Sequence, residues 1–343
     1  MVEVGNVLYA VTPGSYLRLD HDTVRVEVDG ATTLRVPLLR LSGIVCFGSI
    51  AVSPQLIERC AADGRSIVLL SRTGGFAARV EGPTSGNVLL RRAQHLALSD
   101  GIMTCRIARQ IVAGKLQNSR QVLLRASREA IEPADVETLG RAAELLALGL
   151  GRLKDAHNLD VVRGTEGDAA RTYFRAFASM VREDRPAFRP SGRTRRPPRD
   201  RINALLSFLY ALLRSECVSA LEGVGLDPQV GFLHALRPGR PALALDLMEE
   251  LRPVLADRLA LTLVNRRQVR ASGFRELPGG AVYLDDDTRK TVLGAYQKRK
   301  QELVRHRVMR DRVPLGLVPH VQARLLARHL RGDLEYYPPF LYR

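Results

Sequence analysis

Residues 231–253 read Gly-Phe-Leu-His-Ala-Leu-Arg-Pro-Gly-Arg-Pro-Ala-Leu-Ala-Leu-Asp-Leu-Met-Glu-Glu-Leu-Arg-Pro, a loop followed by an apolar helix. Pro241 suits the first turn of this helix, where its missing N–H costs nothing. Asp246 and Glu249 stand three residues apart, so their carboxylates share one helix face. Carboxylates in an apolar stripe are costly to bury without a cation. With His234 just upstream, the stretch predicts a metal site.

The loop between the histidine and the helix carries Arg237 and Arg240, which suggests that the site receives a phosphate. The whole chain is also basic: its 343 residues include 52 Lys and Arg against 36 Asp and Glu, a net charge of +16. Such a surplus points to a polyanionic partner, first of all nucleic acid. A coding bias toward arginine is the alternative. Clustering favours nucleic acid, since seven arginines lie within residues 185–201.

Working outward, the chain divides into two compositional halves. Residues 1–95 show alternating strands, a hairpin signal at Asp29-Gly30 and one short helix capped by Ser53. From Asn87 the apolar period becomes helical and stays so. The predicted fold is α+β, with an N-terminal β-sandwich-like domain over 1–95 and a larger all-α domain over 96–333. An aromatic, proline-rich tail follows over 334–343.

Apolar spacing places the helices of the second half. They are expected over residues 89–100, 102–126, 133–153, 165–183, 200–221, 241–265, 288–307 and 319–331. The arginine-rich segment 185–201 is expected to be a mobile loop, because its prolines and charges prevent core packing. The longest apolar run, Ile202–Leu213, is too short to cross a bilayer. With no signal-peptide pattern and no C-x-x-C pair, we expect a cytoplasmic protein without membrane association.

A third acid, Glu166, comes from a distant segment, Arg-Gly-Thr-Glu-Gly-Asp. Thr165 is expected to cap a helix there, so that the helix N-terminus keeps Glu166 ionised as a metal ligand requires. The alternatives are that Glu166 only stabilises the helix end and that His234 is a hydrogen-bonded core histidine. Oxygen ligands with one imidazole suit Mg²⁺ or Mn²⁺, and the lack of nearby cysteine disfavours zinc. Glu250 is expected to be structural or to support the metal ligands.

Three regions are candidates for DNA contacts: the loop after His234, the arginine-rich segment with the helix that follows it, and a helix near residue 115. A phosphate clamp is what in-line displacement at a phosphodiester needs. A solvated helix face is an equal alternative for the helix near residue 115. The predicted DNA contacts are Arg237, Arg240, Arg193, Arg195, Arg196, Asn203, Lys115, Asn118 and Arg120.

Five segments of the chain resemble one protein family. They read Glu-Gly-x-x-Ala-x-x-Tyr-Phe at 166–174, Asp-x-x-Asn-Ala-Leu-Leu-Ser-Phe-x-Tyr at 200–210, Leu-Glu-Gly-Val-Gly-Leu-Asp-Pro-x-x-Gly-Phe-Leu-His at 221–234, Leu-Ala-Leu-Asp-Leu-Met-Glu-Glu-Leu-Arg-Pro at 243–253 and Lys-Leu-x-Asn-x-Arg at 115–120. Together they resemble the CRISPR-associated integrase/endonuclease, the nuclease subunit of the spacer-acquisition complex. The pattern is closest to that of a type I-C system.

The resemblance implies metal ligands at Glu166, His234 and Glu249, with Asp246 as a supporting catalytic residue. It implies a Mg²⁺- or Mn²⁺-dependent endonuclease and integrase, which joins a prespacer 3′-hydroxyl to a CRISPR repeat array by transesterification. The implied partners are double-stranded and branched DNA, a second copy bound through the N-terminal domain, and a small ferredoxin-like subunit. With this subunit the chain would form a heterohexamer, and the C-terminal tail would dock on it.

Two other functions stay open from the residues alone. The first is a structure-specific DNA repair endonuclease acting on branched DNA with the same acids. The second is a non-catalytic DNA-binding scaffold, in which the carboxylates form ion pairs with Arg237 and Arg240.

Overall fold

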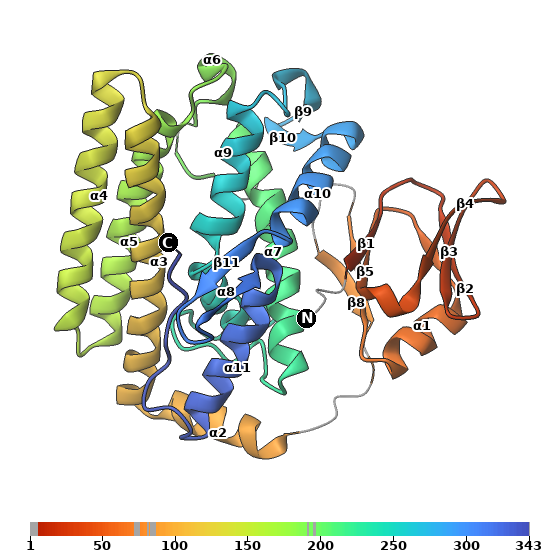
Figure 1. The fold of residues 1–343 in the computed structure, drawn as a ribbon, viewed down its shortest axis with the longest axis horizontal. Helices are drawn as coiled ribbons and strands as arrows, with labels where there is room; N and C mark the ends of the chain where they lie inside the picture. The colour runs from red at the N-terminus through yellow and green to blue at the C-terminus, as the bar shows by residue number, and fades with distance from the viewer. Residues whose placement is uncertain are drawn as a thin grey trace. The chain divides into compact units, whose positions relative to one another are not determined.

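The structure is a computed structural model that describes residues 6–71, 76–80, 82, 87–190, 192–194 and 197–342. The chain divides into two compact units, shown in Figure 1. The first contains residues 1–86 together with 286–298, and the second contains residues 87–285 and 299–343. The first is rich in strands and the second in helices, as the α+β prediction requires.

Two four-stranded sheets and one helix build the first unit. One sheet has the order β1 (Asn6–Ala10), β5 (Leu41–Phe47), β7 (Ser66–Leu70), β8 (Phe76–Val80), and the other β4 (Ala31–Pro37), β3 (Thr23–Val28), β2 (Tyr16–Asp20), β6 (Ala51–Val52). The predicted helix is α1 (Pro54–Ala62), and the hydroxyl of Ser53 accepts the Leu56 N–H at 3.2 Å as its cap. Both sheets contribute to one apolar core. Sequence patterning did not indicate that β1, β5 and β7 run parallel.

The predicted helix over 288–307 ends earlier than expected. Helix α10 covers Asp286–Lys300, and its first thirteen residues belong to the strand-rich unit. There Gln297 donates to the carbonyl of Val7 at 3.1 Å. The chain then forms a hairpin of β11 (Leu303–His306) and β12 (Asp311–Pro314). Val304 and His306 are buried and alternate with exposed residues, as in a strand. The arginines of this segment are equally compatible with a helix, so the alternation was not recognised in the sequence.

Helices dominate the second unit. They are α2 (Val88–Ser99), α3 (Gly101–Glu129), α4 (Pro133–Lys154), α5 (Leu159–Ala176), α6 (Arg185–Phe188), α7 (Arg201–Gly223), α8 (Ala242–Glu249), α9 (Arg258–Asn265) and α11 (Val318–Leu330). A second hairpin joins β9 (Phe274–Leu277) to β10 (Ala281–Leu284). Short 3₁₀ turns cover Phe177–Met180, Ala271–Gly273 and Leu315–Leu317, and another, Leu38–Arg40, lies in the first unit. Helices α3, α4 and α5 pack side by side (Figure 1).

Helix α2 belongs to the helical unit, so the division between the units falls after residue 86 and not after residue 95. The reason is Gln94, which is fully buried. Its side-chain amide donates to the carbonyls of Asp227 and Val230, both at 2.9 Å. A polar group buried in this way ties α2 to the loop that leads to His234.

The predicted single helix over 241–265 is interrupted. Between α8 and α9 the chain forms a π-helical turn, Arg252–Asp257. Pro253 has no N–H to donate to the carbonyl four residues earlier, which breaks the α-helical pattern. The Arg258 N–H then bonds to the carbonyl of Pro253, five residues before it. Glu249 is therefore the last residue of α8, and Arg252 opens the next turn. π-Helical insertions are frequent at functional sites.

Helix α5 begins six residues before the predicted start. Its cap is Asn158, whose side chain accepts the Asp160 N–H at 2.7 Å. Thr165 bonds instead to the carbonyl of Val161 at 2.9 Å, inside the helix. The prediction that Glu166 lies at a helix N-terminus is therefore wrong. Its charge is balanced by a side chain of another helix, as described below.

The arginine-rich segment is not a detached loop where the structure describes it. It contains α6, and Phe188 is buried against Phe274 with ring centroids 5.8 Å apart. Arg201 donates to the carbonyls of Ala187 at 3.2 Å and Ala271 at 3.3 Å. The prediction of a mobile loop considered only the charges and prolines, whereas the aliphatic and aromatic residues between the arginines pack against the helical unit.

Helix α7 is longer than its apolar run suggests. Its 23 residues make it long and apolar enough to span a membrane by length and composition, so the prediction that this segment is too short is wrong. The helix continues through Arg214 and Glu216, where the apolar run ends. In its most apolar window 56% is buried within the chain, which is how a core helix lies.

Candidate metal and nucleic-acid site

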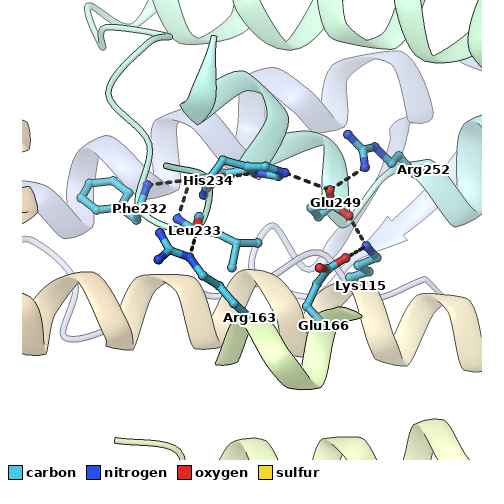
Figure 2. A network of polar contacts seen from close by, with 9 residues as sticks. Lys115, Arg163, Glu166, Phe232, Leu233, His234, Glu249 and Arg252 are labelled. Carbon is cyan, nitrogen blue, oxygen red and sulfur yellow. Dashed lines mark hydrogen bonds and ion pairs between the residues drawn. The ribbon is translucent and has the colours of Figure 1, made fainter. Parts of the chain in front are cut away.

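A buried lysine lies between two of the predicted metal ligands. The ammonium of Lys115 on α3 contacts Glu166 Oε1 on α5 and lies 2.5 Å from Glu249 Oε2 on α8 (Figure 2). The Glu249 side chain is only 2% exposed. Burial opposes its ionisation, but Arg252 and Lys115 outweigh burial and lower the pKa of Glu249. Two acids from separate helices thus share one cation.

Arg252 holds the other oxygen of Glu249. Its Nη1 lies 2.5 Å from Glu249 Oε1, and its guanidinium stacks over the ring of Tyr210 at 5.2 Å. The Tyr210 hydroxyl donates to Asp257 Oδ1 at 2.6 Å. Sequence reasoning did not identify Arg252 as part of the site. The available signal was its spacing of three residues from Glu249, which places the two side chains on one face.

Asp246 organises the loop that carries His234. Its carboxylate accepts the backbone N–H groups of Phe232 at 2.6 Å and of Leu233 and His234 at 2.9 Å. Oδ1 also lies 2.6 Å from His234 Nδ1. With Nδ1–H directed at this carboxylate, Nε2 faces Glu249 Oε1 at 3.8 Å. Asp246 is fully buried and its oxygens are used, so it supports the histidine and is not itself available as a ligand.

Arg163 links the histidine loop to the helix of Glu166. Its Nε donates to the carbonyl of Leu233 at 2.8 Å, directly before His234 (Figure 2). Arg163 lies on α5, three residues before Glu166, so one helix positions both elements. Sequence reasoning also missed this residue, since nothing local in the sequence relates Arg163 to residue 233.

The donor set matches the chemistry of a hard divalent cation. Glu166 and Glu249 supply oxygens, His234 supplies an imidazole nitrogen, and a cation already bridges the two carboxylates. Yet among the described residues no group of three or more His, Cys, Asp or Glu side chains is arranged to hold a metal ion. The charge and the donor types therefore fit Mg²⁺ or Mn²⁺, and the Lys115 ammonium lies between the two carboxylates that would hold such an ion.

A small cavity of about 30 Å³ lies beside this centre. Lys115, Arg252, Tyr210, Tyr173 and Asp257 are among its lining residues. Burial raises the pKa of Asp257 to about 6, although the Tyr210 hydrogen bond acts in the opposite direction. The volume suits about one water molecule among polar groups.

The chain was compared with known proteins. The family model described as "CRISPR associated protein Cas1" matches residues 8–298. The CRISPR-associated endonuclease Cas1 1 of Moorella thermoacetica is 59% identical over 338 residues, covering 98% of each chain. The chain belongs to the Cas1 family. The family resemblance of the five sequence segments is thereby confirmed.

Solved Cas1 structures share the fold. A Cas1 protein from Thermotoga maritima is 25% identical, with a TM-score of 0.81 over 95% of this chain and 97% of that one. A chain of a partial Cas6-RT-Cas1–Cas2 complex is also 25% identical, with a TM-score of 0.66 over 98% of this chain and 99% of that one. The predicted α+β class, with a strand-rich N-terminal part and a larger helical part, is confirmed.

The C-terminal tail of this Cas1 chain docks on its own helical unit. Glu250 accepts the Tyr337 hydroxyl at 2.7 Å, Gln322 Nε2 at 2.9 Å and the Phe340 N–H at 2.7 Å. Asn118 is fully buried and donates to the carbonyls of Glu250 and Phe340. The expected DNA contact by Asn118 is therefore wrong, because this buried side chain holds the tail in place. Docking of the tail on a partner stays a prediction. Glu250 is structural, as predicted.

Two other predicted DNA contacts are engaged within this Cas1 chain. Asn203 is 1% exposed; it accepts from Arg193 Nη1 and donates to the carbonyl of Gly192, both at 2.7 Å. Lys115 is paired with the two acids. The buried Asn203 is not available to a phosphate, so that prediction is wrong. A DNA contact by Lys115 stays a prediction.

The remaining predicted contacts divide by exposure. Arg237 is exposed at the start of a turn that Arg240 closes, with the Arg240 N–H donating to the Arg237 carbonyl at 3.0 Å. Arg120 is half-buried, as is Arg193, whose guanidinium stacks over Tyr210 at 5.3 Å. DNA contacts by these arginines stay predictions. Arg195 and Arg196 lie outside the described residues.

Proposed function

We propose that this chain is a Mg²⁺- or Mn²⁺-dependent DNA endonuclease and integrase that inserts spacers into a CRISPR repeat array by transesterification. The observation that carries the proposal is the meeting of Glu166 and Glu249 around one cation, beside an oriented His234. The name of the Moorella relative, an endonuclease, supports the reaction class.

Glu166, His234 and Glu249 would hold the ion, and Asp246, Arg252 and Arg163 would position them. When bound, the ion would polarise a phosphodiester and lower the pKa of an attacking oxygen group. Asp246 keeps the His234 proton on Nδ1, which leaves Nε2 free to act as a ligand. Arg252 keeps Glu249 ionised and fixes one of its oxygens.

The proposed substrate is double-stranded and branched DNA, comprising the prespacer and the repeat array. The net charge of +16 supports a polyanionic substrate. Arg237 and Arg240 lie on the loop between His234 and α8, so a phosphate bound there would lie next to the acids. Two guanidinium groups suit a phosphate group because each presents a planar fork of donors.

The proposed assembly is a homodimer through the strand-rich N-terminal unit, with a small ferredoxin-like subunit that completes a heterohexamer. The association with a small subunit is supported by the similarity to a chain from a complex described as a partial Cas6-RT-Cas1–Cas2 complex. We further propose that the protein acts in the cytoplasm and belongs to a type I-C system, on the basis of the sequence segments quoted above.

His234→Ala tests the proposed site. We expect this variant to lose cleavage and strand transfer with Mg²⁺ or Mn²⁺, while duplex affinity changes less than about threefold, because binding depends on arginine contacts. His157→Ala, an exposed histidine in the same unit, is the matched control and should keep full activity. Normal integration by His234→Ala would refute the site assignment.

A repeat-array assay separates the proposed function from its alternatives. The wild-type protein is incubated with a labelled prespacer and a repeat array, with and without the small partner subunit. Joined DNA products that form only when the partner subunit is present would support integration. A repair endonuclease would cleave branched DNA without joining, and a scaffold would do neither and would show no heat of Mn²⁺ binding by calorimetry.

A further inference from the structure

The hairpin formed by β11 and β12 places two arginines directly opposite one another. Arg305 lies opposite Arg312 across the two strands. The neighbouring residue on the first strand, Val304, is buried. Because side chains alternate along a strand, Val304 and His306 face the core while Arg305 faces outward. Like charges at directly opposite positions destabilise an antiparallel pair. An anion bound between the two guanidiniums would remove this repulsion.

The hairpin carries four arginines against one carboxylate, Asp311, which accepts the Arg312 N–H at 2.7 Å. Arg305, Arg307, Arg310 and Arg312 are all exposed, and none forms an ion pair within the part of the chain that the structure describes. Between them the turn presents two apolar side chains, with Val308 42% and Met309 52% exposed. A cationic hairpin with an apolar tip is thus directed at solvent.

A chain of hydrogen bonds connects this turn to the metal-site helix. The Met309 N–H donates to His306 Nδ1 at 3.4 Å, and His306 Nε2 lies 3.0 Å from Gln322 Oε1. Because a backbone N–H can only donate, Nδ1 accepts and the ring proton lies on Nε2, which donates to Gln322. Gln322 Nε2 then donates to Glu250 at 2.9 Å, beside Glu249. His306 is 2% exposed and stacks on Phe340. The hairpin is therefore fixed to the element that carries Glu249.

We propose that the hairpin Leu303–Pro314 is a DNA-contacting element of the helical unit. Arg305 and Arg312 bind backbone phosphates, and Val308 and Met309 contact bases where the strands of a branched DNA separate. The inference rests on the proposed function in that it takes DNA as the substrate. Arginine forks match phosphate oxygens, and apolar side chains flanked by basic residues are the groups that proteins insert between base steps.

Arg305→Gln/Arg312→Gln tests the phosphate contacts. Fluorescence anisotropy with labelled duplex and branched DNA is measured from about 50 to 200 mM salt. Loss of two phosphate contacts should reduce the slope of log K against log salt by about two and weaken binding about tenfold to a hundredfold. The control Arg141→Gln/Arg152→Gln removes two exposed arginines of α4 and should change affinity less than about threefold.

Equal effects of the two double variants, or none from the hairpin variant, would overturn the phosphate contacts while the proposed function stands. A wild-type protein that binds no DNA would overturn both. Thermal melting of each variant shows whether the helical unit remains folded. If the hairpin variant is unfolded, Arg305→Lys/Arg312→Lys replaces it; this variant keeps the charge and should keep the slope but lose part of the affinity.

Val308→Ser/Met309→Ser tests the apolar tip. This variant should lose about fivefold or more of its preference for branched over intact duplex DNA, while affinity for the duplex is retained. The control Leu145→Ser/Leu148→Ser changes two apolar residues of α4 that are 47% and 61% exposed and should leave the preference unchanged. An unchanged preference in the hairpin variant would show that the tip does not contact bases.

Discussion

At the residue scale, Asp246 shows how one buried carboxylate shapes the site. Its carboxylate accepts hydrogen bonds from the backbone N–H groups of residues 232–234 and from Nδ1 of His234. These donors would otherwise be buried without partners, which costs free energy for each of them. The carboxylate thus both folds the loop and sets the orientation of the imidazole, so its loss affects stability and chemistry together.

Asp246→Asn should therefore impair both properties. The amide replaces one acceptor with an NH₂ group that faces backbone donors, and we expect about 1–3 kcal/mol less free energy of unfolding. Because the imidazole loses its orienting partner, cleavage should fall about tenfold to a hundredfold. Urea unfolding and a metal-dependent cleavage assay measure the two effects. Asp168→Asn, at an exposed position of α5, should change neither. Full cleavage activity in Asp246→Asn would contradict the positioning role.

Asp257 gives a prediction about pH. Burial raises its pKa in the folded chain to about 6, above the usual 3.8. Between about pH 4 and pH 6 the folded protein therefore holds more protons than the unfolded chain, and the contribution of Asp257 to stability falls as pH rises through this window. The ionised form, present above about pH 6, costs on the order of 3 kcal/mol relative to the protonated form.

Asp257→Asn should remove this dependence, because an amide accepts the Tyr210 hydroxyl at every pH. We expect the variant to gain about 1–3 kcal/mol relative to the wild type at about pH 8 and to gain little near pH 4, where Asp257 is protonated in the folded chain. Urea denaturation at both pH values measures the difference. An equal effect at both pH values would show that burial does not raise the pKa of Asp257 in solution.

At the element scale, the C-terminal tail acts as an internal strap. The tail lies along α3 and α11 in Figure 1, and its hydrogen bonds join α3, the end of α8 and α11 through Asn118, Glu250 and Gln322. Burial raises the pKa of Glu250 to about 8, while its three donors oppose the change. The residues that flank Glu249 and Lys115 are thus held by the last residues of the chain.

Variants of two adjacent tyrosines test whether the tail stabilises the fold through its buried hydrogen bonds. Tyr337 is 1% exposed and its hydroxyl donates to Glu250, whereas Tyr336 is 56% exposed. Tyr337→Phe should cost about 1–3 kcal/mol of unfolding free energy, because it leaves Glu250 and Gln322 short of a partner. Tyr336→Phe should cost less than about 0.5 kcal/mol. Equal melting temperatures for the two variants would exclude a strap function for Tyr337.

At the scale of the whole molecule, metal binding should appear as a change in stability. A ligand that binds only the folded state stabilises it by about 2.7 kcal/mol at a hundred times its Kd. Adding Mn²⁺ to protein freed of metal by EDTA should therefore raise the melting temperature. Lys115→Ala should melt lower than wild type in EDTA, because Glu166 and Glu249 then repel one another, and should gain more from Mn²⁺. A smaller gain than in the wild type would mean that Lys115 does not occupy the position of the ion.

Much of the site was predictable from local spacing. The three-residue separation of Asp246 and Glu249 does place both on the face toward His234, and the acidic segment at Glu166 does meet them. The role of Lys115 was not predictable, because a basic residue on a half-buried helix is typical of a solvated face. Asn118 was assigned to DNA because it shares this helix with Lys115 and Arg120, but its partners are Glu250 and, more than two hundred residues away, Phe340 and Tyr342 of the tail.

The sequence by itself determined the two-part α+β organisation, most helices, the family and the acids with their histidine. Each depends on periodicity, caps or short motifs, which are local properties of the chain. Only the tertiary structure decided that Lys115 bridges the acids, that Arg252 and Arg163 position the ligands, and that the tail folds back onto Glu250. These contacts join residues far apart in the chain, and their partners are chosen by burial, where every ion and polar group must find a counterpart.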